Sequence, residues 1–198
     1  GLTEPLADHP VKISLGSILD DIADAISFCI APAWIFYITL LDSQNVFVLN
    51  LPIVFATLFY AVLGIGRLVY FTLDKNPIPG FFKGMPTPGA ALLVTAPLIM
   101  FNQSLSDEPR MIYFWGIFCF VTIITAAVFM NLYPIRYLHL GRFFGRHPWF
   151  GRLSFLVLLS VFTPYFGYIS FIYMLLYFFS PLITWRINPE DAARETKA

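Results

Sequence analysis

The sequence has little charge. Of its 198 residues only 12% are Asp, Glu, Lys or Arg, whereas 58% are hydrophobic; an ordinary soluble domain has about 25% charged residues. The twelve basic and twelve acidic residues cancel, so the net charge is zero and nothing in the composition favours nucleic acid as a partner. These proportions exclude a soluble globular domain and indicate an integral membrane protein.

Cysteine is also scarce, with only Cys29 and Cys119 in the chain. Both lie in apolar stretches and they form no CxxC pair, which excludes a disulfide framework and a cysteine zinc site. We expect both to be small core residues. The first ten residues are polar rather than a basic stretch followed by an apolar one, so we expect no cleavable signal peptide among them.

Long apolar stretches are abundant and predict an all-α, polytopic helical bundle. Stretches near the roughly 20 residues that cross a bilayer cover 17–41, 46–72, 87–102 and 111–132, and a longer one covers 153–183. The last contains Thr163-Pro164-Tyr165-Phe166-Gly167. Because proline and glycine interrupt helices, we expect two segments there, 153–163 and 165–183. One kinked, tilted helix is the alternative.

The basic residues separate to one side of this arrangement. With six spans and the amino terminus inside, every Lys and Arg except Arg110 lies in an inner loop or tail or, in the case of Arg67, near the inner end of its span. Since Lys and Arg mark the cytoplasmic side, we expect six spans with both ends in the cytoplasm and membrane lipids as neighbours. The loops are short and no repeat is visible, so residues 1–198 are expected to form one membrane-embedded domain.

Three acids interrupt the apolar segment 17–41. An ionised side chain at membrane depth costs about 2.5–3.5 kcal/mol on insertion scales, so Asp20, Asp21 and Asp24 indicate a site that faces the bundle interior. Asp20 and Asp24 are four residues apart and share a helix face, whereas Asp21 points about 100° away and fits a helix-start acid. The alternative is that Asp20 and Asp24 only stabilise a helix amino terminus, although Asp24 is already two turns in.

Several motifs together suggest a family. Gly16, Asp20 and Asp24 form GxxxDxxxD, which resembles the second half of the signature of the CDP-alcohol phosphatidyltransferases, membrane enzymes of phospholipid synthesis. The run LDDIADAISFCIAPA, residues 19–33, resembles their phosphatidylserine synthase branch. Gly66-Arg67-Leu68 with Phe71, and FKGMPTPGAA at 82–91, are similar to two further stretches of that branch. Asn131 with Tyr133-Pro134 is similar to a third, with the spacing off by one.

The resemblance implies a reaction and a set of residues. A phosphatidyl group would pass from CDP-diacylglycerol to the hydroxyl of serine with release of CMP, dependent on Mg²⁺ or Mn²⁺. Asp20 would be a metal ligand, and Asp24 would lie at the metal and act as general base. Gly16 would allow the CDP group to approach the backbone. Substrate binding is expected from Arg67, Lys83 and Asn131, although Arg67 and Lys83 could instead be cytoplasmic-side topology anchors.

The family also suggests a setting for the enzyme and leaves rivals open. It implies a bacterial or archaeal inner membrane, an active site that faces the cytoplasm and a homodimer. Within the family, the acceptor could instead be inositol phosphate, glycerol phosphate or choline. Outside it, the rival is a small transporter or a non-catalytic membrane scaffold that uses the acids as an ion site, although no related halves are visible.

The first half of the family signature, DxxDGxxAR, does not occur before Gly16. The chain also starts at Gly1 rather than at a methionine. We therefore expect a longer reading frame whose preceding helix supplies the missing aspartates, without which this chain alone would be inactive. A degenerate relative of the family is the alternative.

Overall fold

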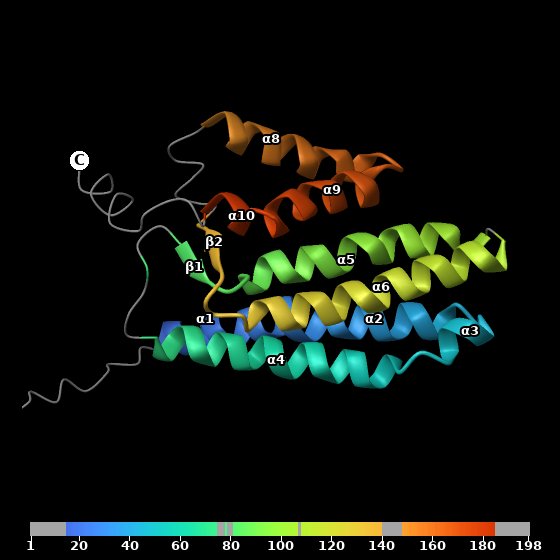
Figure 1. The fold of residues 1–198 in the computed structure, drawn as a ribbon, viewed down its shortest axis with the longest axis horizontal. Helices are drawn as coiled ribbons and strands as arrows, with labels where there is room; N and C mark the ends of the chain where they lie inside the picture. Colours follow the sequence, from blue (N-terminus) through green and yellow to red (C-terminus); the bar gives the residue numbers. More distant parts are fainter. Residues whose placement is uncertain (1–14, 75–77, 79–80, 107, 140–147, 185–198) are drawn as a thin grey trace, which may run out of the picture.

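The structure, a computed structural model, is a bundle of roughly aligned helices, with a small sheet and α10 at one end (Figure 1). It describes residues 15–74, 78, 81–106, 108–139 and 148–184. The helices are α1 (Leu15–Asp24), the π-helix η1 (Ala25–Ile30), α2 (Ala31–Asp42), α3 (Val46–Leu49), α4 (Ile53–Leu73), α5 (Thr87–Gln103), α6 (Pro109–Met130), α8 (Pro148–Leu159), α9 (Phe166–Phe178) and α10 (Pro181–Thr184), with short 3₁₀ turns at Ser104–Ser106 and Ser160–Phe162.

Four helical segments of the described chain are long and apolar enough to cross a membrane. They are Ile18–Asp42, Ile53–Leu73, Pro109–Met130 and Phe166–Ile183. Trp149–Phe162 is a shorter apolar helix. The prediction of a helical membrane bundle is therefore confirmed.

Helix α5 forms the centre of the bundle, where it packs against α2, α6 and α9. Most of its residues are buried, including Gly89, Ala90, Ala91 and Ala96. Small residues let helix backbones approach closely, which favours association inside a membrane. The two cysteines are free and buried among the helices, as expected for small core residues.

The predicted segment 46–72 is wrong as a single helix, because the chain breaks at residues 50–52, between α3 and α4. Proline has no backbone N–H and disfavours helical geometry in the residue before it, so Pro52 stops α3 from continuing. The Asn45 side chain caps α3, since its Oδ1 accepts from the N–H groups of Phe47 and Val48 at 3.0 and 3.3 Å.

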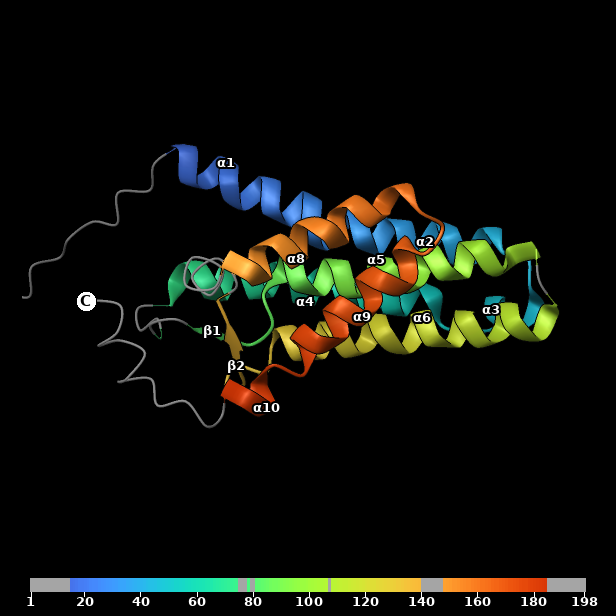
Figure 2. The same ribbon diagram turned by 90° about the horizontal axis from the view of Figure 1, so that it is seen from above.

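The long apolar stretch 153–183 divides where its proline and glycine predicted. The 3₁₀ turn ends at Phe162, and α9 begins at Phe166 after a turn at residues 163–165. Helices α8 and α9 then run back along each other (Figures 1 and 2). The alternative of one kinked helix is therefore wrong. A second break precedes Pro181 and separates α10 from α9.

A two-stranded antiparallel sheet, which the sequence did not predict, joins two loops at one end of the bundle (Figure 1). Strand β1 (Phe81–Lys83) pairs with β2 (Arg136–Leu138), with Phe82 opposite Tyr137. Gly84 follows β1 with φ +76° and donates its N–H to Ile135 O at 2.7 Å. The sheet and this turn hold the start of α5 against the end of α6.

Replacing Gly84 tests this turn. In Gly84→Ala the residue keeps a left-handed backbone, and the new Cβ would lie 2.5 Å from the carbonyl oxygen of Met130. We expect the free energy of unfolding to fall by about 1–3 kcal/mol, measured as a lower thermal transition of the protein in detergent. Gly66→Ala is the control, since nothing lies within 4 Å of its Cβ and alanine favours a helix interior. Equal stability of the two variants would contradict the role given to Gly84.

Candidate functional site

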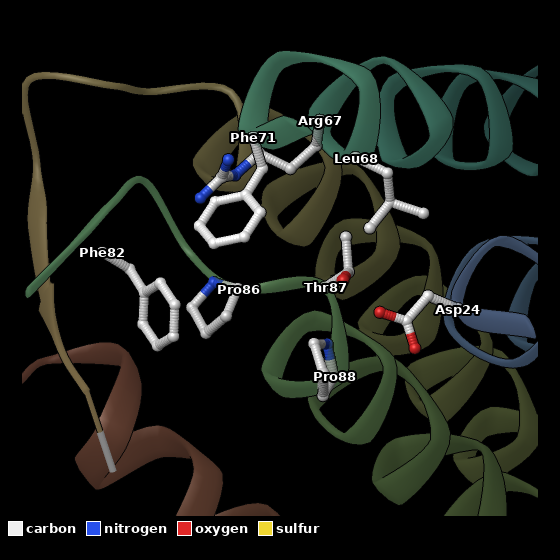
Figure 3. A pocket seen from close by; sticks show the side chains of 8 residues that line it. All are labelled: Asp24, Arg67, Leu68, Phe71, Phe82, Pro86, Thr87 and Pro88. Carbon is white, nitrogen blue, oxygen red and sulfur yellow. The ribbon is translucent and has the colours of Figure 1, made fainter. Parts of the chain in front are cut away.

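A pocket of about 170 Å³ lies where α4, β1 and the start of α5 meet the end of α1. It is lined by Asp24, Arg67, Leu68, Phe71, Phe82, Pro86, Thr87 and Pro88. Figure 3 shows the Asp24 carboxylate directed toward the start of α5, where Thr87 and Pro88 lie. The Arg67 guanidinium extends from α4 toward Phe71 and Pro86. An acid and a base from segments 43 positions apart therefore share one cavity.

Asp24 is the last residue of α1 and is only partly exposed. The other acids of this helix, Asp20 and Asp21, are exposed, and so is Gly16. Figure 2 shows why, because α1 leaves the bundle toward its amino-terminal end. Of the GxxxDxxxD residues, the structure thus brings only Asp24 into the pocket.

Arg67 is buried, with 3% of its surface exposed. Within the described part of the chain, neither Nε nor Nη1 has a hydrogen-bond partner, and no ion pair joins Arg67 to Asp24. Its Cζ lies 5.9, 5.6 and 5.9 Å from the ring centroids of Tyr70, Phe71 and Tyr133. Such cation–π contacts stabilise a cation by about 0.5–2 kcal/mol each, but a buried charge still calls for an anionic partner.

The start of α5 contributes the third wall of the pocket. Thr87 opens this helix and is buried, with 5% exposed. A helix amino terminus carries partial positive charge and unpaired N–H groups that favour anions. Together with the guanidinium of Arg67, this wall makes one side of the pocket suitable for a phosphate group.

Lys83 does not line the pocket as described. Its Nζ lies 2.7 Å from Oδ2 and 2.9 Å from Oδ1 of Asp74, and both side chains are less than one-fifth exposed. This ion pair fixes β1 to the end of α4. The sequence expectation that Lys83 binds substrate has no support in this geometry.

Asn131 also has other partners than a ligand. Its Nδ2 donates to Leu63 O at 3.2 Å and to Ala127 O at 3.1 Å, and its Oδ1 accepts from the hydroxyl of Tyr133 at 3.0 Å. Burial raises the pKa of the Tyr133 phenol, which keeps it protonated as that donor. Asn131 therefore ties the end of α6 to α4 and lies outside the set of residues that line the pocket.

The donor set fits a divalent cation only in part. Asp20 and Asp24 lie four apart on α1, and carboxylate oxygens suit Mg²⁺ or Mn²⁺. However, no group of three or more His, Cys, Asp or Glu side chains that could hold a metal occurs among the described residues. A metal held here would need ligands beyond these two carboxylates.

Comparisons of the chain with protein-family models, with curated proteins and with solved structures returned no match. The resemblance to CDP-alcohol phosphatidyltransferases therefore rests on the motifs of the chain itself.

Sequence reasoning missed Phe82, Pro86 and Thr87 as individual residues of the site. They lie in the stretch 82–91, which resembles the family. Lys83 is the charged residue of that stretch, and charge is the feature from which phosphate binding is expected in a sequence. The signal that points to Thr87 is the Pro-Thr-Pro sequence, because proline in the first turn marks a helix start.

Because Nε and Nη1 of Arg67 have no hydrogen-bond partner in the described part of the chain, anion binding at this residue can be tested. We expect inorganic pyrophosphate to raise the thermal transition of the wild-type protein, because a ligand at one hundred times its Kd stabilises by about 2.7 kcal/mol. In Arg67→Met this rise should disappear, while the ligand-free transition should be no lower than that of the wild type, since a buried unpaired charge is removed. Arg110→Met, at an exposed position, is the control and should keep the response. A lower transition that pyrophosphate still raises would contradict the site.

Proposed function

We propose that this chain is the membrane domain of a CDP-alcohol phosphatidyltransferase of the phosphatidylserine synthase type. One observation carries the proposal. The pocket is lined by residues from three separate stretches that resemble the family, namely 19–33 through Asp24, 66–71 through Arg67 and 82–91 through Thr87. Motifs that were recognised independently and meet in one cavity are expected of an active site rather than of chance similarity.

The reaction would use these residues in distinct ways. The serine hydroxyl oxygen attacks the phosphorus that carries the diacylglycerol, the bond from that phosphorus to the CMP oxygen breaks, and CMP leaves with the electron pair. Asp24 accepts the hydroxyl proton, which requires its carboxylate within about 3 Å of the attacking oxygen. Arg67 and the start of α5 hold phosphate oxygens, where positioning and charge neutralisation supply most of the catalysis.

The cation would be Mg²⁺ or Mn²⁺, which neutralises negative charge on the diphosphate. Asp20 and Asp24 would hold it together with the aspartates of the family's DxxDGxxAR helix. The part of α1 that leaves the bundle (Figure 2) and its exposed Asp20 offer a face on which such a helix can lie.

The proposed topology has six spans and a cytoplasmic site. Beyond the four segments of sufficient length, α5 and the helix Trp149–Phe162 would complete the six. The pocket then lies on the side to which the positive-inside rule assigns Arg67, Lys83 and Arg136. A bacterial or archaeal inner membrane and a homodimer follow from the family resemblance alone.

Loss of the proposed base provides the main functional test. We expect the protein from the full reading frame to release CMP from CDP-diacylglycerol with serine and Mn²⁺, and Asp24→Asn to lower this rate by about 10²-fold or more, since general base catalysis contributes about 10²–10⁴-fold. Asp21→Asn changes an exposed neighbour in the same way and should retain the rate. Retained turnover in Asp24→Asn would remove Asp24 as the base. Substituting inositol phosphate, glycerol phosphate or choline for serine identifies the acceptor.

The upstream reading frame gives an independent check. We expect the residues that precede Gly1 to encode a membrane helix with DxxDGxxAR at the family spacing from Gly16. Determining that coding sequence is sufficient. A frame without these acids would leave the metal with too few ligands and would contradict catalysis by this protein.

A further inference from the structure

A π-helix separates the acid in the pocket from the rest of its transmembrane helix. Segment η1 follows Asp24 directly, and the N–H of Ala31 donates to Ile26 O, the i to i+5 pattern of a π-turn. From Cys29, near the end of η1, the buried positions follow an α-helical pattern, with Cys29, Ala33 and Phe36 at spacings of four and three residues. The helix therefore contains one residue more than an α-helix of the same course would need.

The extra residue decides which side chain faces the pocket. Asp24 lies five positions before the buried Cys29, whereas an uninterrupted α-helix would bring the residue four positions before, Ala25, to the same face. Asp24 would then be turned away by about 100°. The orientation of Asp24 in Figure 3 thus depends on where the π-turn lies.

One face of α4 contacts this turn. The hydroxyl of Tyr60, which is fully buried, donates to Phe28 O within η1 at 2.9 Å. One turn further along α4, the backbone of Gly64 lies so close that a Cβ there would be 2.7 Å from Cys29 Sγ. Arg67 follows on the same buried face. The helix that presents Arg67 therefore also fixes η1, and with it the position of Asp24.

We propose that Tyr60 is a positioning residue that pins the π-turn at Ala25–Ile30 and so keeps Asp24 directed into the pocket. Without this hydrogen bond the additional residue of the π-turn can be accommodated at another turn of the helix. The Asp24 side chain then points to a different side of the helix. The consequence for catalysis rests on the proposed function, whereas the geometric claim concerns the helix alone and is tested separately.

Cross-linking tests the geometry without any assumption about activity. The pair Asp24→Cys and Pro88→Cys places two thiols in one pocket, while the native cysteines are buried. A short thiol-specific bifunctional reagent should join the pair, as read by mass spectrometry of the digested protein. Tyr60→Phe should lower the yield about five- to tenfold, in keeping with loss of one buried hydrogen bond. Ile22→Cys with Pro88→Cys, which uses an exposed position of α1, is the control for non-specific reaction.

A deletion variant distinguishes a positioning role of Tyr60 from a role in stability alone. Removing Ile26, an exposed residue of η1, converts the π-turn into an α-turn with Asp24 four positions before Cys29. We therefore expect the deletion alone to keep the cross-link, and the deletion combined with Tyr60→Phe to restore it, because no surplus residue remains to move. If Tyr60 contributed only to stability, deleting Ile26 would not restore the cross-link yield of Tyr60→Phe.

Three outcomes of the cross-linking experiment would overturn the proposal. One is a cross-link yield in Tyr60→Phe equal to that of the protein with Tyr60. Another is a low cross-link yield in a folded variant that combines the Ile26 deletion with Tyr60→Phe. The third is a deletion variant without a cooperative thermal transition, which would show that the helix needs Ile26.

In CMP release, Tyr60→Phe should lower kcat about five- to tenfold with little change in KM, and combining it with the Ile26 deletion should restore kcat. Absence of CMP release in the wild type would refute the proposed function but leave the cross-linking result standing.

Discussion

Arg67 has only 3% of its surface exposed, so its positive charge has to be stabilised by the groups around it, and several groups at one end of this protein surround it. The rings of Tyr70 and Tyr133, stacked with centroids 3.7 Å apart, lie beside Arg67. Asn131 holds Tyr133, and the start of α5 completes the enclosure. These groups leave Nε and Nη1 of Arg67 without a hydrogen-bond acceptor in the described part of the chain, and a phosphate would supply one under the proposed function.

The helical bundle was predictable because the bilayer sets both the length and the composition of its helices. The break within 153–183 was also predictable, since Pro164 and Gly167 interrupt an apolar run that is too long for one span. Pro52 also marks a helix break, but it lies in a stretch of ordinary span length, so the length of that stretch does not indicate two helices. The strands β1 and β2 could not be anticipated, because each has only three residues and its partner lies more than fifty positions away.

For the candidate site, the sequence motifs contain Asp24 and Arg67, and both residues line one pocket. The same motifs gave no means of separating binding residues from supporting ones. Lys83 and Asn131 have suitable chemistry for a ligand, yet their polar atoms are engaged by Asp74 and by backbone carbonyls. Residue type can be read from a sequence, whereas the groups that compete for a side chain depend on loops that come together only in the fold.

The shortness of α5 has a consequence for how a lipid would be handled. At 1.5 Å per residue its 17 residues span about 26 Å, less than the roughly 30 Å of a bilayer's hydrocarbon core, and α4 extends past its start in Figure 1. The cavity at that start therefore lies beside α4, short of the end of α4. Under the proposed function, a lipid headgroup would reach this recessed cavity by lateral diffusion within its own leaflet while its acyl chains stay in the hydrocarbon core, whereas a water-soluble partner would have to enter past the end of α4.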